Sequence, residues 1–275
     1  MSSSELARAA ALLRAADGLL IGAGAGIGVD SGLPDFRGDH GFWRAYPPLA
    51  ALGIRFVEIA NPRNFDSHPE LAWGFYGHRL ALYRATVPHA GFAILRNIGE
   101  RLKHGAFVFT SNVDGQFQRA GFGDDRLVEC HGSIHHLQCT RPCSDAIWPA
   151  DAVAPLVDPC IDPATCLMTP PLPRCPHCGA LARPNILMFG DSRWLDARTE
   201  AQYARLEHWR AQVGNLVVIE LGAGTDVPSV RHMCEAQGVP LVRINPREPA
   251  VRPGRGVGVA MGALEALVTL RALLD

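Results

Sequence analysis

The sequence has almost no lysine and no excess of charge of either sign. Of its 26 Lys and Arg residues only Lys103 is a lysine, and the formal net charge is −1 over 275 residues. The arginines run along the chain without forming a patch, so no direct nucleic-acid partner is expected. Runs of about 18 apolar residues are also missing, which excludes a membrane-spanning segment and a membrane partner.

The N-terminal segment also lacks the apolar stretch of a signal peptide. Glu5, Arg8, Arg14 and Asp17 interrupt it, and we therefore expect a cytoplasmic protein. The eight cysteines of a cytoplasmic chain are better interpreted as metal ligands or buried thiols than as disulfides.

Four of the cysteines have the spacing of a zinc site. The sequence CPHCG at 175–179 is a strong half-site, and the pair Cys139 and Cys143 is weaker because three residues separate its members. Cys160 or Cys166 could replace Cys143. A closed shell of four thiolates would make the metal structural rather than catalytic. The predicted zinc ligands are Cys139, Cys143, Cys175 and Cys178.

Short apolar segments alternate with helical stretches along the chain. Helices are expected at 5–16 and 89–103 and at the C-terminus, and this alternation predicts an α/β fold, a Rossmann-like parallel sheet with helices on both faces. The predicted strands are 18–24, 106–110, 185–189, 216–221 and 240–244.

Two segments do not follow this alternation. Residues 39–86 are aromatic-rich and helical in pattern, and residues 133–183 hold most of the cysteines with many prolines. We interpret the first as an inserted helical module and the second as a zinc-binding module. The Rossmann-like domain is then discontinuous, and its predicted parts are 1–38, 87–132 and 184–275.

Four glycines follow the first predicted strand, at positions 22, 24, 26 and 28. Glycines at a strand–helix turn let main-chain amides approach a pyrophosphate. The strict G-x-G-x-x-G spacing fails, because Ile27 or Val29 stands at the sixth position, and this argues against a standard dehydrogenase. A tight strand–helix crossing that binds no ligand is the alternative for this segment alone.

The segment that follows resembles a known family. Residues 24–38, GAGIGVDSGLPDFRG, are similar to the sirtuin motif GAGIS-x-x-SGIPDFRG, with Gly28 in place of the usual serine. TSNVD at 110–114 resembles TQNID, with Ser111 in place of glutamine. HGS at 131–133 and RPNILMFGD at 183–191 match further sirtuin motifs, and the matches occur in the family's order.

This resemblance implies an NAD-dependent protein lysine deacylase. Asn112 and Asp114 would hold the nicotinamide end of NAD, and His131 would act as the general base on a ribose hydroxyl. Leu187, Phe189 and Gly190 would line the channel for the acyl-lysine partner. The NAD contacts implied are Gly24, Ala25, Gly26, Asp35, Phe36, Arg37, Ser111, Asn112, Asp114, His131, Gly222, Gly224, Asn245 and Met261.

Each of these residues could also have an ordinary structural role. TSNVD follows a buried strand at the carboxyl edge of a sheet, where ligands bind, but an Asn/Asp turn cap fits it as well. Any one of eleven histidines is more often a packing or surface residue than a base.

The pair Tyr76 and Arg79 carries a prediction about the acyl group. In one sirtuin class a Tyr-x-x-Arg pair selects succinyl, malonyl or glutaryl groups over acetyl. Side chains at i and i+3 of a helix point the same way, and a guanidinium forks onto a carboxylate. A surface Arg beside a core Tyr is the alternative.

Two other functions stay open at this point. The first is a protein ADP-ribosyltransferase or an NAD glycohydrolase, which would cleave the same bond between nicotinamide and ribose C1′. Residues 222–227, GAGTDV, stand where sirtuins have GTSLxV, and the changes at Gly28, Ser111, Ala223 and Gly224 all fall in the nucleotide site. The second is a non-catalytic sensor of NAD or ADP-ribose.

Overall fold

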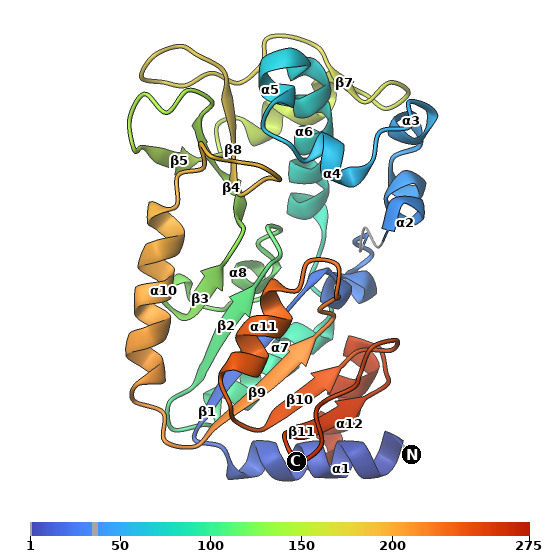
Figure 1. Ribbon diagram of the computed structural model, residues 1–275, viewed down its shortest axis with the longest axis vertical. Coiled ribbons are helices and arrows are strands. Elements are labelled where there is room, and N and C mark those ends of the chain that lie inside the picture. Colours follow the sequence, from blue (N-terminus) through green and yellow to red (C-terminus); the bar gives the residue numbers. More distant parts are fainter. Residues whose placement is uncertain (1, 35–37) are drawn as a thin grey trace.

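The computed structural model describes residues 2–34 and 38–275 (Figure 1). Its larger part is a six-stranded sheet in the order β11-β10-β9-β1-β2-β3, with every neighbouring pair parallel. The strands β1 and β9 are buried along their whole length, as expected for a sheet covered on both faces. The strands are β1 Gly18–Ala23, β2 Ala106–Thr110, β3 Leu127–Glu129, β9 Leu216–Leu221, β10 Leu241–Ile244 and β11 Gly256–Val259.

Helices cover both faces of this sheet, as predicted. One face packs with α1 Ser2–Ala15, α7 Ala90–Glu100 and α12 Ala263–Leu274 in a single apolar cluster. The other face packs against α10 Ala197–Arg210 and α11 Ser229–Ala236. In the part of the chain that the structure describes, no helix is both long and apolar enough to cross a bilayer.

The order of the strands reverses beside β1. The chain moves from β1 to β2 on one side and from β9 to β10 on the other, so the connections that leave β1 and β9 run in opposite directions. Open α/β sheets bind ligands at such a switch point, outside the carboxyl ends of the strands.

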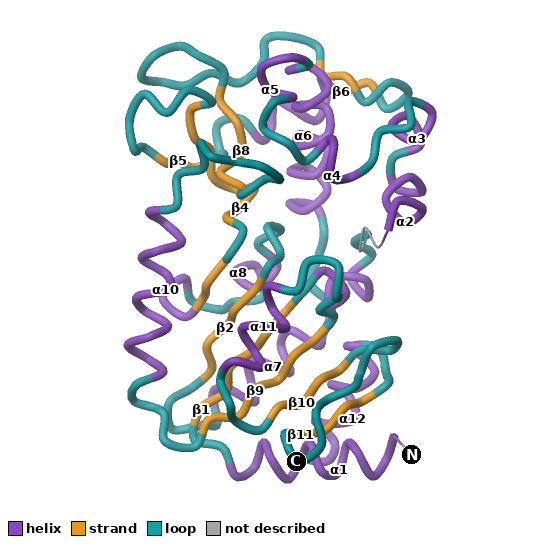
Figure 2. The backbone as a smooth tube through the Cα atoms, in the orientation of Figure 1, coloured by secondary structure: helices purple, strands orange, loops and turns teal. Residues whose placement is uncertain are grey.

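A second body stands above this edge of the sheet (Figures 1 and 2). The helical segment and the cysteine-rich segment share one apolar cluster there, which includes Phe42, Trp73, Leu137 and Val157. The two segments therefore pack as one unit. Its elements are α2 Gly38–Ala45, α3 Pro47–Ala51, α4 Phe56–Ile59, α5 Asn64–Ser67, α6 Pro69–Ala85, β4 Gly132–Cys139, β5 Ile147–Pro149, α9 Ala154–Val157, β6 Ile161–Asp162, β7 Leu167–Met168 and β8 Ala182–Ile186.

The prediction that 185–189 is a strand of the main sheet was wrong. The strand there, β8, pairs antiparallel with β4 in a three-stranded sheet of the upper body, and the predicted boundary at 183/184 cuts it. A short apolar run does not reveal which sheet it joins. In the structure, a buried polar pair joins β8 to β4: Asn185 Nδ2 donates to Gln138 Oε1 at 2.9 Å.

Candidate active site

Two glycine-containing turns meet at the switch point. The first follows β1 and contains Gly24 and Gly26, and the second follows β9 and contains Gly222 and Gly224. Gly24 N donates to Leu221 O, and Gly26 N donates to Gly222 O, both at 3.0 Å. A Cβ on Gly222 would lie 2.3 Å from Ile27 N, and Gly222 has a positive φ of 62°. A Cβ on Gly24 would lie 2.8 Å from Gly222 O. Only glycine fits at these two positions, and the result is a ledge formed by main chain.

Other predicted nucleotide contacts surround this ledge. Ala25 is exposed, Gly26 is half-buried, and nothing lies within 4 Å of a Cβ placed on Gly224, so these three border open space. Met261 is half-buried. Asp35, Phe36 and Arg37 lie outside the described residues.

The Asn245 side chain forms hydrogen bonds with the main chain of the second glycine turn and of the loop after β10. It is completely buried, its Nδ2 donates to Ala223 O at 3.0 Å, and its Oδ1 accepts from the amides of Arg247 and Glu248. These bonds hold the second glycine turn, and a contact between Asn245 and the nucleotide stays a prediction.

Residues 111 and 112, directly after β2, donate hydrogen bonds to the end of β1 and the first glycine turn. Asn112 Nδ2 donates to Gly24 O at 3.2 Å, and Ser111 N donates to Ala23 O at 3.2 Å. Thr110 Oγ1 accepts from Asn112 N at 3.0 Å, which fixes the amide-bearing residue at the end of the strand. The structure therefore brings the predicted Ser111 and Asn112 against the ledge.

Asp114 is a buried carboxylate in the same segment. Burial raises its pKa to about 6, and nearby Glu129 adds to the rise, while the Gln116 amide that donates to Asp114 Oδ1 at 2.9 Å opposes it. A carboxyl group shifted toward neutrality in this way, at the ligand edge of a sheet, is typical of functional sites.

His131 occupies the turn between β3 and β4. Its Nε2 lies 3.2 Å from Ser229 Oγ, and its carbonyl accepts from Leu187 N at 2.9 Å. Burial lowers the pKa of the imidazole, and a main-chain contact with Ser111 offsets part of that effect. The ring is therefore neutral near pH 7 and able to accept a proton.

Tyr76 and Arg79 lie together on α6, inside the upper body. Their side chains are 1% and 7% exposed, and the guanidinium carbon of Arg79 is 5.9 Å from the centre of the Tyr76 ring. Arg79 Nε and Nη2 donate to Tyr83 Oη at 3.0 and 2.6 Å. The predicted pair thus converges, but as part of the core rather than on the surface.

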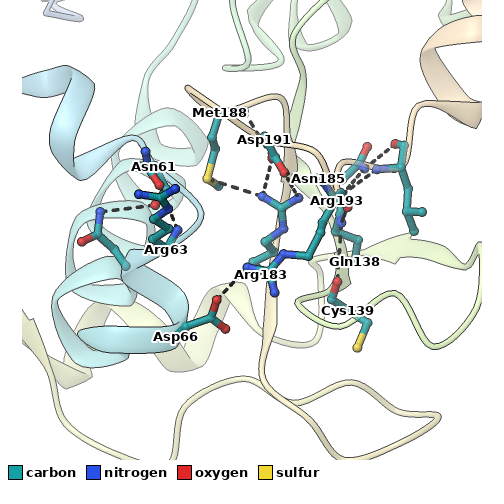
Figure 3. A network of polar contacts seen from close by, with 12 residues as sticks. Asn61, Arg63, Asp66, Gln138, Cys139, Arg183, Asn185, Met188, Asp191 and Arg193 are labelled. Atoms are coloured by element: carbon teal, nitrogen blue, oxygen red, sulfur yellow. Dashed lines mark hydrogen bonds and ion pairs between the residues drawn. The ribbon is translucent and has the colours of Figure 1, made fainter.

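The loop after β8 is tied by a buried ion pair, drawn in Figure 3. Arg183 Nη1 and Nη2 donate to the two carboxylate oxygens of Asp191 at 2.6 and 3.0 Å, and both side chains are at most 1% exposed. Met188 N and Arg193 N also donate to Asp191 at 3.4 and 3.0 Å. The pair closes residues 183–191 into a fixed loop.

The predicted substrate residues lie on this loop. Leu187 and Phe189 are each 38% exposed, and Gly190 has a positive φ of 68°. Phe189 N donates to Ala60 O at 3.0 Å, which ties the loop to the helical segment. Exposed apolar side chains on a rigid loop are suited to contact with a peptide.

The four predicted zinc ligands form one cluster. Their sulfur atoms all lie within 4.8 Å of one another, with Cys139 to Cys178 at 3.6 Å and Cys143 to Cys175 at 3.7 Å. Zn–S bonds of about 2.3 Å in a tetrahedron require S···S distances of about 3.8 Å, so the donors fit a structural zinc ion. Cys143, and neither Cys160 nor Cys166, completes the set.

Two participants were not predicted. Ser229 contacts His131 from a segment 98 residues away, and Tyr83 orients Arg79 from the next turn of its helix. Tyr83 could have been found from the i, i+4 spacing. No local pattern signals Ser229, because only the fold brings it near the imidazole.

Comparison with known proteins agrees with this geometry. The Sir2 family model matches residues 24–220. The chain is similar to an NAD-dependent protein deacylase of Aquifex aeolicus, at 30% identity over 83% of each chain. It is also similar to an NAD-dependent protein deacylase of Thermococcus kodakarensis, at 32% identity over 90% of this chain and 87% of the relative.

Solved structures agree on the fold. A Sir2 homologue mutant in complex with ADP-ribose has a TM-score of 0.70 and 25% identity, covering 100% of this chain and 96% of that one. A Sir2 homologue in complex with NAD has a TM-score of 0.69 at 24% identity, covering 100% and 96%. The family model covers residues 24–220 and a relative 32% identical matches 90% of this chain, so the chain belongs to the Sir2 family.

Proposed function

We propose that this protein is an NAD-dependent protein lysine deacylase that releases nicotinamide, free lysine and O-acyl-ADP-ribose. One observation carries the proposal: a half-buried imidazole, that of His131, lies at the same sheet edge as the Asn112–Asp114 segment and the glycine ledge, and burial lowers its pKa. The names of the relatives, NAD-dependent protein deacylases, point to the same reaction.

The main chain of the ledge binds the dinucleotide. Amides at a strand–helix turn favour a pyrophosphate, and Gly224, where a Cβ would meet nothing within 4 Å, leaves no side chain in its way. Asn112 and Asp114 orient the nicotinamide end, so that its bond to ribose C1′ faces the acyl oxygen. Departure of nicotinamide then lets that oxygen bond to C1′.

His131 acts after this cleavage. Its neutral ring takes the proton of a ribose hydroxyl, and the freed oxygen attacks the acyl carbon. The bond from that carbon to the lysine nitrogen then breaks, the amine leaves with the proton held by the ring, and one water molecule adds to complete O-acyl-ADP-ribose. A burial-lowered pKa keeps the ring unprotonated at neutral pH, which this step requires. General-base catalysis of this kind contributes about 10²–10⁴-fold to a rate.

The zinc ion would be held by Cys139, Cys143, Cys175 and Cys178. Four thiolates fill its coordination shell, so the metal contributes to the stability of the upper body and has no open position for chemistry.

We further propose that Tyr76 and Arg79 select acyl groups that end in a carboxylate, such as succinyl, malonyl or glutaryl. A guanidinium enclosed by aromatic side chains binds a carboxylate strongly, because little water competes for it. Tyr83 holds the guanidinium in one orientation, which adds to the selectivity. Arg79→Gln tests this role.

The partner is thus an acylated-lysine protein or peptide. We propose a cytoplasmic location, because all eight cysteines are free and a thiolate zinc site is maintained in a reducing compartment.

The test is product analysis with a panel of acyl-lysine peptides and NAD. We expect O-acyl-ADP-ribose by mass spectrometry, and His131→Ala should abolish turnover while NAD binding by calorimetry stays within a few-fold. Free ADP-ribose with intact acyl-peptide would instead establish a glycohydrolase, and peptide-bound ADP-ribose a transferase. NAD binding without any nicotinamide release would establish a sensor.

A further inference from the structure

We propose that Ser229 is a positioning residue for His131. Its Oγ lies 3.2 Å from His131 Nε2, across 98 residues of sequence. This inference rests on the proposed function, because it concerns the general base of that reaction.

The main chain around His131 is already fixed. Leu187 N donates to His131 O, and Cys130 N donates to Thr110 O, both at 2.9 Å. A Cβ on Gly132 would lie 2.1 Å from Asn185 O, so the neighbouring strand packs directly on the turn. The imidazole ring also contacts the main chain of Ser111, and the Ser229 hydroxyl is the side-chain partner that, with this contact, sets the rotation of the ring.

Ser229 is itself held rigidly, at the first residue of α11. The next residue, Val230, is buried, and Arg231 donates to Ala223 O at 3.2 and 3.1 Å. Arg231 also pairs with the Glu248 carboxylate at 3.1 Å. One short helix therefore anchors the second glycine turn and the hydroxyl that contacts the base, so the nucleotide ledge and the imidazole are aligned by the same element.

The hydroxyl can serve both protonation states of the ring. With the neutral ring protonated at Nδ1 the hydroxyl donates to Nε2, and once the ring is charged the hydroxyl accepts from Nε2–H. Hydrogen bonds from a charged donor are about twice as strong as neutral ones, so Ser229 favours the imidazolium that forms on proton transfer. The contact thereby offsets part of the effect of burial, which disfavours that charge.

The experiment compares Ser229→Ala and Ser229→Thr with the wild type. Loss of one such hydrogen bond is expected to lower kcat by about 3- to 10-fold, with KM for NAD changed less than twofold. Ser229→Thr, which keeps the hydroxyl, should recover most of kcat. Ser67→Ala is the matched control, since it removes a serine–histidine contact of 2.9 Å with His68 on the exposed surface.

A second measurement does not depend on activity. In ligand-free protein, titration of His131 followed by NMR should give a lower pKa in Ser229→Ala than in the wild type, and an unchanged pKa in Ser67→Ala. An unchanged His131 pKa together with an unchanged kcat would overturn the proposal. So would a raised KM for NAD at constant kcat, which would make Ser229 a nucleotide contact. If the wild type releases no nicotinamide, the proposed function fails while the titration still decides whether Ser229 governs the ring.

Discussion

The two sides of the site are built from different parts of the chain. The proposed nucleotide side is formed by main chain, where the turns that contain Gly24 and Gly222 approach so closely that a Cβ would meet atoms at 2.8 and 2.3 Å. The proposed acyl side is formed by side chains, with Tyr76 and Arg79 buried on one helix and Phe189 exposed on a tied loop.

This difference explains which departures from the sirtuin pattern the fold tolerates. Gly28, Ser111 and Ala223 replace residues usual in the family, yet the main-chain bonds from Gly24 to Leu221 and from Gly26 to Gly222 are formed. A binding surface made of amides and carbonyls depends on backbone geometry, so side chains beside it can change. On the acyl side the chemistry is in the side chains, and we expect a substitution there to alter selectivity directly.

The largest effect is expected when the ledge loses a glycine. Gly222→Ala places a Cβ 2.3 Å from Ile27 N at a φ of 62°, which forces the two turns apart. We expect NAD affinity to fall at least 100-fold by calorimetry and Tm to fall by several degrees. Gly224→Ala is the folding control, because its Cβ would meet nothing within 4 Å and Tm should hold. Wild-type NAD affinity in Gly222→Ala would refute a ledge made of main chain.

A smaller effect is expected when one of the zinc ligands in the upper body is replaced. Cys143→Ser removes one of four thiolates, so bound zinc should fall by mass spectrometry and Tm should drop. Cys160→Ser, outside the cluster, should retain full zinc content. Equal zinc in both variants would exclude the proposed ligand set.

The acyl side alone should respond to Arg79→Gln. We expect kcat/KM for a succinyl-lysine peptide to fall about 10- to 100-fold and that for the acetyl peptide to change little, because a charge-assisted pair is lost only with the charged acyl group. Tyr83→Phe, which removes the partner of the guanidinium, should give a weaker version of the same pattern. Equal losses for both peptides would mean that Arg79 supports the fold and not the selectivity.

The smallest effect concerns the pH dependence of stability. The folded-state pKa of Asp114 is raised to about 6, so the wild type gains stability as pH falls from about 6 toward about 4, when the folded protein takes up the proton. Asp114→Asn removes the cost of ionising this buried carboxyl group. The variant should therefore be about 1–3 kcal/mol more stable than the wild type at pH 7, and the difference should vanish near pH 4. Urea unfolding at both pH values measures it. A variant less stable at pH 7 would show that the ionised carboxylate is well stabilised.

Much of this arrangement could be predicted from the sequence. The segments 18–24, 106–110, 216–221 and 240–244 are short and mostly apolar, and such runs alternating with helices are typical of a parallel sheet covered on both faces. The four zinc ligands followed from spacing and thiolate chemistry, although Cys143 needed the structure to be chosen over Cys160 and Cys166.

The rest depends on contacts between distant segments. The strand Ala182–Ile186 was assigned to the wrong sheet, because its partner β4 is set by buried polar pairs that no local pattern reveals. The β3 and β11 strands, at three and four residues, are too short to show periodicity. Ser229 was missed because hydrogen bonding across 98 residues leaves no signal in its own segment.

The most direct test is the stoichiometry of the wild-type reaction. Purified protein would be given NAD and a succinyl-lysine peptide, and released nicotinamide would be counted against freed lysine over time. A deacylase releases one nicotinamide for each lysine freed, with no release when the peptide is omitted. Nicotinamide release that continues without peptide, or peptide that stays acylated while NAD is consumed, would contradict the account.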